Sequence, residues 1–142
     1  MYKYILIIAM LFGVFHSYGQ ANGAISNKKH KIIFQLVSQD TSDHSTLIRQ
    51  LTNLKKLAPK SQIEVVCHGP GINLLRKDKT SLVDKIEGLI QNGVDFVACE
   101  FTMTQKNIKR EQLIDHVRTV PGGILEIVEK EEKDWSYIKA GK

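Results

Sequence analysis

The sequence predicts an α/β protein, a three-layer α/β/α sandwich with a parallel sheet of about five strands. Short apolar runs without strict alternation, typical of strands buried on both faces, alternate with amphipathic helical segments. The connections between these runs hold whole helices, whereas antiparallel neighbours need only a two-residue turn. The 142 residues suffice for one domain, which we place at residues 31–141.

The first half of the domain supplies two strands joined by a long helix. Residues 31–38, KIIFQLVS, form the first predicted strand, and residues 62–68, QIEVVCH, form the second. Leucines recur at helical spacing between them. This helix should end at Ala58, because Pro59 disfavours the helical conformation in the residue before it. The Gly-Pro-Gly that follows the second strand breaks it sharply.

The second half continues the alternation. Residues 72–77, INLLRK, are expected to form one or two helical turns. Ser81, with an aspartate three residues later, resembles a capping box for a helix that stops at Gly93. The remaining predictions, in chain order, are a strand, a short helix, a brief strand, a helix and a last strand: residues 94–99, 110–115, 118–120, 123–134 and 135–140.

Two packing predictions concern the C-terminal part of the chain. In the last helix we expect Ile124, Ile127 and Val128 to face the sheet, because their spacing places them on one side. Trp135 is expected to anchor the core at the start of the last strand.

The N-terminus has the pattern of an export signal. Lys3 precedes an apolar run at residues 5–15, and Ser17-Tyr18-Gly19 supplies small residues before a cleavage point. The run is shorter than the roughly 20 residues that a membrane span needs, although an uncleaved anchor stays an alternative. We therefore predict a cleaved signal peptide at residues 1–19, a flexible leader at residues 20–30, and a periplasmic or secreted protein without a stable membrane span.

Composition narrows the function. The net charge of +5 is mild, and the lysines are scattered without interleaved aromatic residues, so we expect no nucleic-acid partner. The sequence has no G-x-G-x-x-G, P-loop, G-x-S-x-G or C-x-x-C motif. No carboxylate pair sits at matching strand ends, so glycosidase chemistry has no support. Cys67 and Cys99 permit one disulfide or two free thiols.

Ligands of parallel sheets bind beyond the carboxyl ends of the strands, and candidate residues cluster at three such ends. Glycines there let the backbone approach a ligand, and a helix start offers unpaired N–H groups that lower the pKa of a nearby thiol. Cys99 is the candidate reactive thiol and Cys67 a secondary one. The candidate pocket residues are His68, Gly69, Pro70, Gly71, Glu100, Gly122 and Gly123.

Each candidate also has a purely structural interpretation. Cys99 and Cys67 suit buried packing, His68 suits a loop hydrogen bond, and Glu100 suits a solvated position. A zinc site from the two thiols and His68 lacks a fourth ligand at readable spacing. We therefore predict no metal and no cofactor.

Three stretches, IEVVCHGPGINLLRKDKT, GVDFVACEFTM and VPGGILEIVEKEEKDWSYIKAG, resemble the DsrE/DsrF-like family, in particular a largely uncharacterised subgroup whose members often carry export signals. The resemblance implies a five-stranded parallel sheet and assembly into trimers or hexamers. Its better-known members are sulfur-relay proteins that carry a persulfide on a cysteine just after the third strand, where Cys99 stands here. Cys67 matches no typical family cysteine, and Glu100-Phe101-Thr102-Met103 stands where the cytoplasmic relay proteins have a small, basic stretch.

Three functions follow as hypotheses. The first is sulfur handling through a persulfide on Cys99, with a protein as sulfur donor or acceptor. The second is a non-enzymatic module that binds a small anionic or thiol-containing ligand at the strand ends, and the third is a redox pair of Cys67 and Cys99. For the homo-oligomer, we also expect an exposed apolar segment that needs covering, at Ile72, Leu74 and Leu75.

Overall fold

The computed structural model describes residues 26–142. The predicted signal peptide and most of the predicted leader lie outside this range. Five parallel strands form one sheet in the order β4-β3-β2-β1-β5. The strands are β1 (Lys31–Leu36), β2 (Gln62–Cys67), β3 (Val94–Cys99), β4 (Arg118–Val120) and β5 (Ser136–Ala140). The predicted parallel α/β fold is therefore confirmed.

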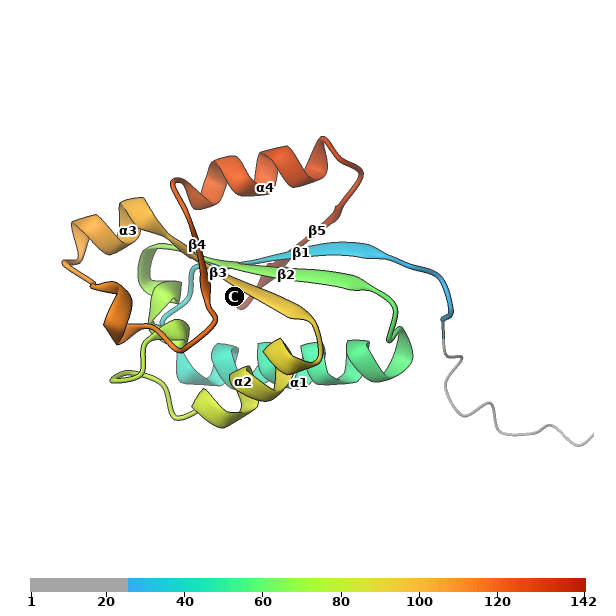
Figure 1. Cartoon of the computed structure of the whole chain (residues 1–142), viewed down its shortest axis with the longest axis horizontal. Helices are drawn as coiled ribbons and strands as arrows, with labels where there is room; N and C mark the ends of the chain where they lie inside the picture. Colours follow the sequence, from blue (N-terminus) through green and yellow to red (C-terminus); the bar gives the residue numbers. More distant parts are fainter. Residues whose placement is uncertain (1–25) are drawn as a thin grey trace, which may run out of the picture.

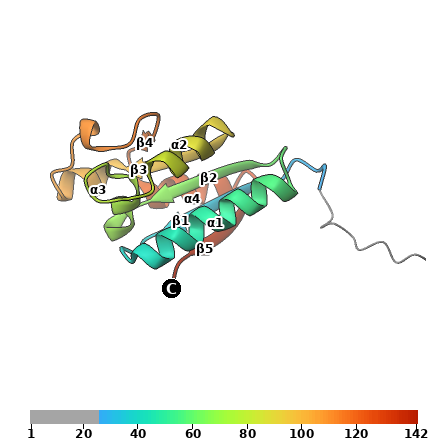
Figure 2. The same cartoon turned by 90° about the horizontal axis from the view of Figure 1, so that it is seen from below.

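Helices cover the two faces of the sheet unequally. α1 (Thr41–Leu57) and α2 (Val83–Gln91) lie on one face, and α4 (Gly123–Glu131) lies on the other, as Figure 1 shows. Seen from below, α1 and α2 run across the sheet in front of the strands (Figure 2). This arrangement arises because the chain moves outward from β1 to β4 and then returns through α4 to pair β5 with β1.

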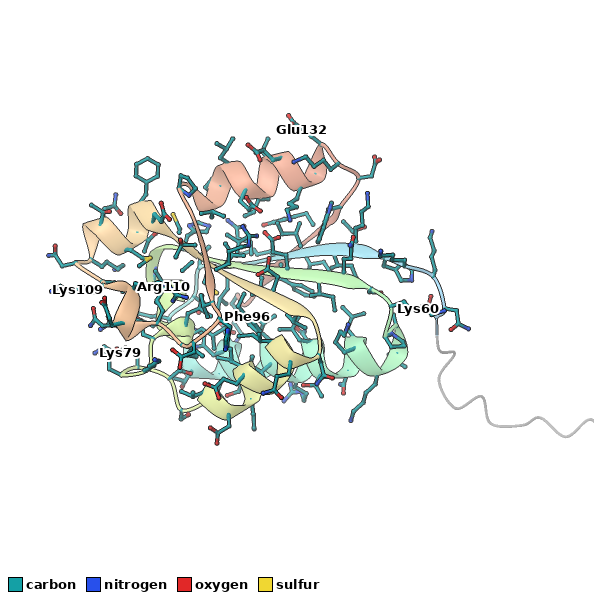
Figure 3. All side chains as sticks on the ribbon, viewed as in Figure 1. Lys60, Lys79, Phe96, Lys109, Arg110 and Glu132 are labelled. Carbon is teal, nitrogen blue, oxygen red and sulfur yellow. The ribbon has the colours of Figure 1, made fainter. Side chains whose placement is uncertain are left out.

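The larger core lies between the sheet and the α1 and α2 helices. Phe96 of β3 is fully buried there, and Figure 3 shows it inside the molecule while Lys60 and Lys79 lie at its periphery. A smaller cluster fills the face under α4, with one side chain each from β1, β2, β3, β4 and α4: Ile33, Val66, Val97, Val120 and Ile127. Trp135 packs against this second cluster but is only partly buried, so it is less of a core anchor than predicted.

Neighbouring residues explain where α1 begins and where α1 and α2 end. The Asp40 side chain accepts a hydrogen bond from the Ser42 N–H, which caps the start of α1. α1 ends at Leu57, with Ala58 as its C-cap, as Pro59 predicts. α2 ends just before Gly93, whose φ of +81° suits glycine. Ser81 does not cap α2, however, because Leu82 is its N-cap and no side-chain bond is made there.

Two packing predictions are wrong. Ile72, Leu74 and Leu75 are fully buried in the 3-10 helix η1 (Gly69–Leu75), where they join the larger core, so they give no support to an oligomer. On α4 only Ile127 of the predicted inward residues is buried, and Ile124 and Val128 are exposed. The reason is that α4 alone covers its face, so only a narrow stripe of the helix touches the sheet.

Two short helices complete the chain. The structure places α3 (Glu100–Gln105) directly after β3, where the sequence analysis predicted neither a helix nor a strand. The predicted helix at residues 110–115 is shorter, the 3-10 helix η2 (Arg110–Gln112). Figure 3 shows Lys109 and Arg110 in this outer part of the molecule. Across residues 26–142, no helix is both long and apolar enough to span a membrane.

Candidate thiol site

Cys99 lies at the carboxyl edge of the sheet, between the starts of two helices. It ends β3 and is also the N-cap of α3. On its other side, β4 leads through Pro121 and Gly122 into α4, whose first residue is Gly123. The Gly123 N–H donates a hydrogen bond to Cys99 Sγ at 3.3 Å. The sheet edge thus brings together the thiol and one of the predicted glycines.

Gly123 allows this approach because it has no side chain. A Cβ atom built there would lie 3.1 Å from Val66 Cγ1, 3.2 Å from Cys99 Cβ and 3.3 Å from His68 Cβ. At Gly122 the nearest atoms, from Phe101 and Leu125, would be 3.7 to 3.8 Å from a Cβ, which is ordinary contact. Of the two glycines, Gly123 is therefore the one that sets the distance between α4 and the thiol.

The surroundings of Cys99 favour its thiolate. Burial by itself raises the pKa of the Cys99 thiol, since the side chain is only 5% exposed. Hydrogen bonding from the Gly123 N–H, with contributions from Thr102 and Phe101 at the start of α3, outweighs burial and leaves the pKa below its ordinary value. Of these donors, only Gly123 meets full hydrogen-bond geometry. The start of α4 therefore supplies the main donor to the thiolate, and the start of α3 adds weaker contributions.

Thr102 links the thiol to the loop after β2. Its hydroxyl oxygen accepts a hydrogen bond from the Gly69 N–H at 2.9 Å, which leaves the hydroxyl proton free to point at the sulfur. Sequence reasoning missed Thr102, because the helix after Cys99 was not predicted. A threonine at the third position of a helix that begins with a candidate cysteine is the signal that could have found it.

A cavity of about 500 Å³ opens beside the thiol. His68, Cys99, Thr102, Gly122 and Gly123 line its inner part. The remaining wall is apolar and comes from α3 and α4: Phe101, Ile124, Leu125 and Val128. The structure thus brings together four of the predicted site residues, Cys99, His68, Gly122 and Gly123, and adds apolar residues that the sequence interpretation had placed in the core or had not singled out.

His68 is held by a chain of polar side chains. Its Nε2 lies 2.7 Å from Gln35 Nε2, and Tyr137 donates its hydroxyl to Gln35 Oε1. The simplest assignment has the Gln35 amide donating to an unprotonated Nε2, which fixes the neutral tautomer with its proton on Nδ1. Partial burial lowers the pKa of His68, in keeping with a neutral ring. His68 is therefore a neutral, oriented member of the cavity wall.

The other predicted pocket residues lie elsewhere. Gly69, Pro70 and Gly71 are outside the wall of the thiol cavity. A Cβ at Gly71 would lie 2.2 Å from the Leu36 carbonyl oxygen, so this glycine serves the packing of η1 against β1. Glu100 accepts a hydrogen bond from the Thr119 hydroxyl at 2.7 Å and lines a separate cavity of about 540 Å³. It therefore faces away from the thiol.

Cys67 is separated from Cys99 by the sheet. It is fully buried in the core under α1 and α2, whereas Cys99 contacts α4 on the opposite face. Burial raises the pKa of the Cys67 thiol far above its ordinary value, and both cysteines are free. Because the two thiols point to opposite faces, they cannot form a disulfide without disruption of the sheet. This geometry argues against the redox-pair hypothesis.

A group of charged residues lies beneath the other end of α4. Glu64 of β2 is 1% exposed, and its Oε2 accepts hydrogen bonds from Lys130 and from Arg118, the latter at 3.1 Å. Its Oε1 is buried without a partner. Asp95 and Glu126 also pair with Arg118, so three carboxylates share two cations. Burial raises the pKa of Glu64 to about 7, against the opposing effect of Lys130.

Metal ligands are not grouped in the described part of the chain. Among residues 26–142, no three His, Cys, Asp or Glu side chains are placed to hold a metal ion together. His68 and Cys99 share a cavity, but Cys67 lies behind the sheet. The chemistry available at this edge is therefore that of a thiolate beside a neutral imidazole and an apolar wall.

Known proteins share this fold over most of the chain. The sequence profile of the DsrE/DsrF-like family matches residues 30–140. A protein of unknown function, MTH1491 from Methanobacterium thermoautotrophicum, superposes with a TM-score of 0.75 at 29% identity, covering 78% of this chain and 99% of its own. No curated protein matches the sequence.

Two further solved structures support the fold alone, since their identities are low. The ychN protein from E. coli has a TM-score of 0.63 at 16% identity, over 78% of this chain and 98% of its own. The conserved protein of unknown function BT1422 from Bacteroides thetaiotaomicron has a TM-score of 0.64 at 13% identity, over 77% and 93%. With its profile match and its five-stranded parallel sheet, this chain belongs to the DsrE/DsrF-like family.

Proposed function

We propose that this protein handles sulfur by carrying it as a persulfide on Cys99. The single observation that carries the proposal is the Gly123 N–H, which donates to Cys99 Sγ at the start of α4. A thiol with a lowered pKa, at the floor of a cavity and at a strand end, has the properties of a nucleophilic sulfur acceptor. The resemblance to the family's sulfur-relay members supports the proposal, because it implies a persulfide cysteine just after the third strand, where Cys99 stands.

The proposed step needs no metal and no external oxidant. The Cys99 thiolate attacks the terminal sulfur of a donor persulfide, R–S–SH, and a new Cys99 S–S bond forms. The S–S bond of the donor breaks at the same time, and R–S⁻ leaves with the bonding electron pair. The transferred sulfur keeps its proton and its oxidation state, so charge and atoms balance. A second thiolate takes the sulfur from Cys99 in the same way.

Intact-mass measurement after exposure to a persulfide donor tests this function. We expect a gain of about 32 mass units, one sulfur atom, on the wild-type protein that a thiol reductant removes. Cys67→Ser is the matched control and should load equally, whereas Cys99→Ser should not load. A loss of about 2 mass units would instead indicate a disulfide.

The second candidate is a binding module without sulfur transfer. The thiol cavity favours it, because its volume of about 500 Å³ suits a small molecule. In that case the wild-type protein would gain no sulfur from any donor. Blocking Cys99 with a small alkylating reagent would then leave ligand binding largely intact, which separates the two candidates.

Export belongs to the proposal. The pattern of residues 1–19 supports cleavage after Gly19 and a site of action in the periplasm or outside the cell. N-terminal sequencing of the protein from soluble and membrane fractions tests it. A mature chain that starts at Gln20 is the expected result, and intact Met1 on membrane-bound protein would contradict it.

Assembly into a trimer or hexamer is also proposed, mainly from the family resemblance. In the structure, β5 is an edge strand with exposed Tyr137 and Ile138, and an exposed edge is a surface on which a second copy can pair. Light scattering of the mature protein tests the proposal. A monomer mass at every micromolar concentration would refute it.

A further inference from the structure

We propose that the Cys99 cavity accepts sulfur donors or acceptors with neutral, apolar tails, and that it discriminates against charged ones. This inference names the substrate class for the function proposed above and rests on it. Among residues 26–142, seven large hydrophobic side chains are exposed, and four of them stand together in the wall of this one cavity. The four are Phe101, Ile124, Leu125 and Val128.

The side chains of this wall are more exposed than large hydrophobic side chains usually are. Phe101 is 69% exposed, and Ile124 and Leu125 are 57% and 58% exposed. Apolar side chains gathered on one patch commonly mark a binding surface, whereas scattered ones need no explanation. The wall surrounds a reactive group, so covering it with the tail of a substrate would also exclude water from the thiolate.

The charge of the wall points to an uncharged ligand. Of the nine residues that line the cavity, none carries a formal charge when His68 is neutral, apart from the Cys99 thiolate, which is negative and repels an anionic group. A donor with a carboxylate or sulfonate group would have to lose part of its hydration without gaining a cation as partner. At the start of α4, the Gly123 N–H, which lies nearest the thiol, already donates to Cys99.

The depth of the thiol favours a small molecule over a flat protein surface. Cys99 is 5% exposed at the inner end of the cavity, so only a narrow group can reach its sulfur. The volume of about 500 Å³ falls within the range of small-molecule sites. An alkyl persulfide fits this description, because its terminal sulfur leads and its hydrocarbon tail stays along the apolar wall.

Neutral alkyl methanethiosulfonates of increasing length test the apolar preference without any persulfide. The Cys99 thiolate attacks their sulfenyl sulfur, a mixed disulfide forms, and methanesulfinate leaves. The rate of each reagent with Cys99 is divided by its rate with free 2-mercaptoethanol, which corrects for the intrinsic reactivity of the reagent. Full burial of a methylene corresponds to a rate gain of about fourfold and half-burial to about twofold, so the additional methylenes of the hexyl reagent predict about a thirtyfold gain over the methyl reagent. The anionic sulfonatoethyl reagent should react more slowly than the neutral reagent of similar size.

Leu125→Gln and Leu57→Gln form a matched pair of variants. Both leucines are exposed, but Leu57 ends α1 and does not line the cavity. We expect the gain with chain length to fall at least threefold in Leu125→Gln and to stay unchanged in Leu57→Gln. Circular dichroism establishes that both variants are folded. Equal relative rates for all chain lengths, faster reaction with the sulfonate, or no reaction of the folded wild-type protein would overturn the inference.

Light scattering tests the remaining explanation, that the apolar wall is an interface between copies of this chain. If Leu125→Gln lowers the oligomer mass and speeds the reaction with the methyl reagent, the wall is an interface between copies and the inference fails. Failure of sulfur loading with a retained chain-length effect would instead remove the proposed function and leave the apolar site in place. Sulfur loading without a chain-length effect would keep the proposed function and remove the apolar site.

Discussion

Gly123→Ala tests the central contact of the thiol site. The new methyl group would meet Val66, Cys99 and His68 at 3.1, 3.2 and 3.3 Å, all tighter than ordinary contact. The start of α4 must therefore move by a few tenths of an ångström, and the Gly123 N–H moves away from Cys99 Sγ. Overpacking costs about 1–3 kcal/mol, and the better helix propensity of alanine offsets up to about 1 kcal/mol. The variant should remain folded.

The effect on the thiol follows from the lost donor. A hydrogen bond to a charged group is worth about 1.5–3 kcal/mol and one to a neutral group about 1 kcal/mol. The difference stabilises the thiolate by about 0.5–2 kcal/mol, so its loss should raise the pKa of Cys99. At pH values below that pKa the thiolate fraction falls about tenfold. A thiolate of higher pKa is about threefold more nucleophilic, so the net rate falls about threefold.

The assay is the alkylation rate of Cys99 as a function of pH, followed by mass spectrometry of the labelled peptide. Gly122→Ala is the control, because its methyl group meets only ordinary contacts at 3.7 to 3.8 Å. We expect the midpoint of the rate profile to move upward in Gly123→Ala and to stay in place in Gly122→Ala. An unchanged midpoint in a folded Gly123→Ala variant would refute the assignment of the Gly123 N–H as the donor that lowers the pKa.

Three further predictions concern stability and burial. Gly88→Ala in α2 should raise the free energy of unfolding by about 0.5–1 kcal/mol in urea, because a Cβ there meets nothing within 4 Å; destabilisation would contradict this. Burial raises the pKa of Glu64 to about 7 from an unfolded value of 4.5, so the folded state binds the proton more tightly, and wild-type stability should fall by a few kcal/mol between about pH 4.5 and 7. Glu64→Gln should lack this part of the slope, and parallel pH profiles of the two proteins would count against the assignment. Cys67 should resist alkylation until the protein unfolds, because it is fully buried, and labelling at the rate of Cys99 would show that assumption to be wrong.

Local patterns determined the strands and the fold class. The third and fourth strands, Val94–Cys99 and Arg118–Val120, begin and end where the apolar runs predict. Pro59 and Gly93 fixed two helix ends, because their backbone preferences act on adjacent residues only. The helix that begins at Glu100 was missed, since six residues with two threonines and a phenylalanine carry no helical period.

In the candidate site, the sequence predicted which residues lie at the strand ends but not the role of each one. Sequence position alone placed Cys99, His68, Gly122 and Gly123 at strand ends, and the parallel sheet brings those ends to one edge. The roles within the site depended on contacts across the chain. Gly123 N–H lies 24 positions after the sulfur that it stabilises, and Glu100, the immediate neighbour of Cys99, faces another cavity.

The sequence by itself determined the parallel α/β fold and the strand end at which Cys99 lies, because hydrophobic period and turn chemistry are properties of neighbouring residues. Only the tertiary structure decided that Cys67 lies on the far face of the sheet and that Ile124 and Val128 point outward. Both outcomes depend on which helices cover each face. One helix covers the α4 face and two cover the other, and that asymmetry follows from the return of the chain to β5 beside β1.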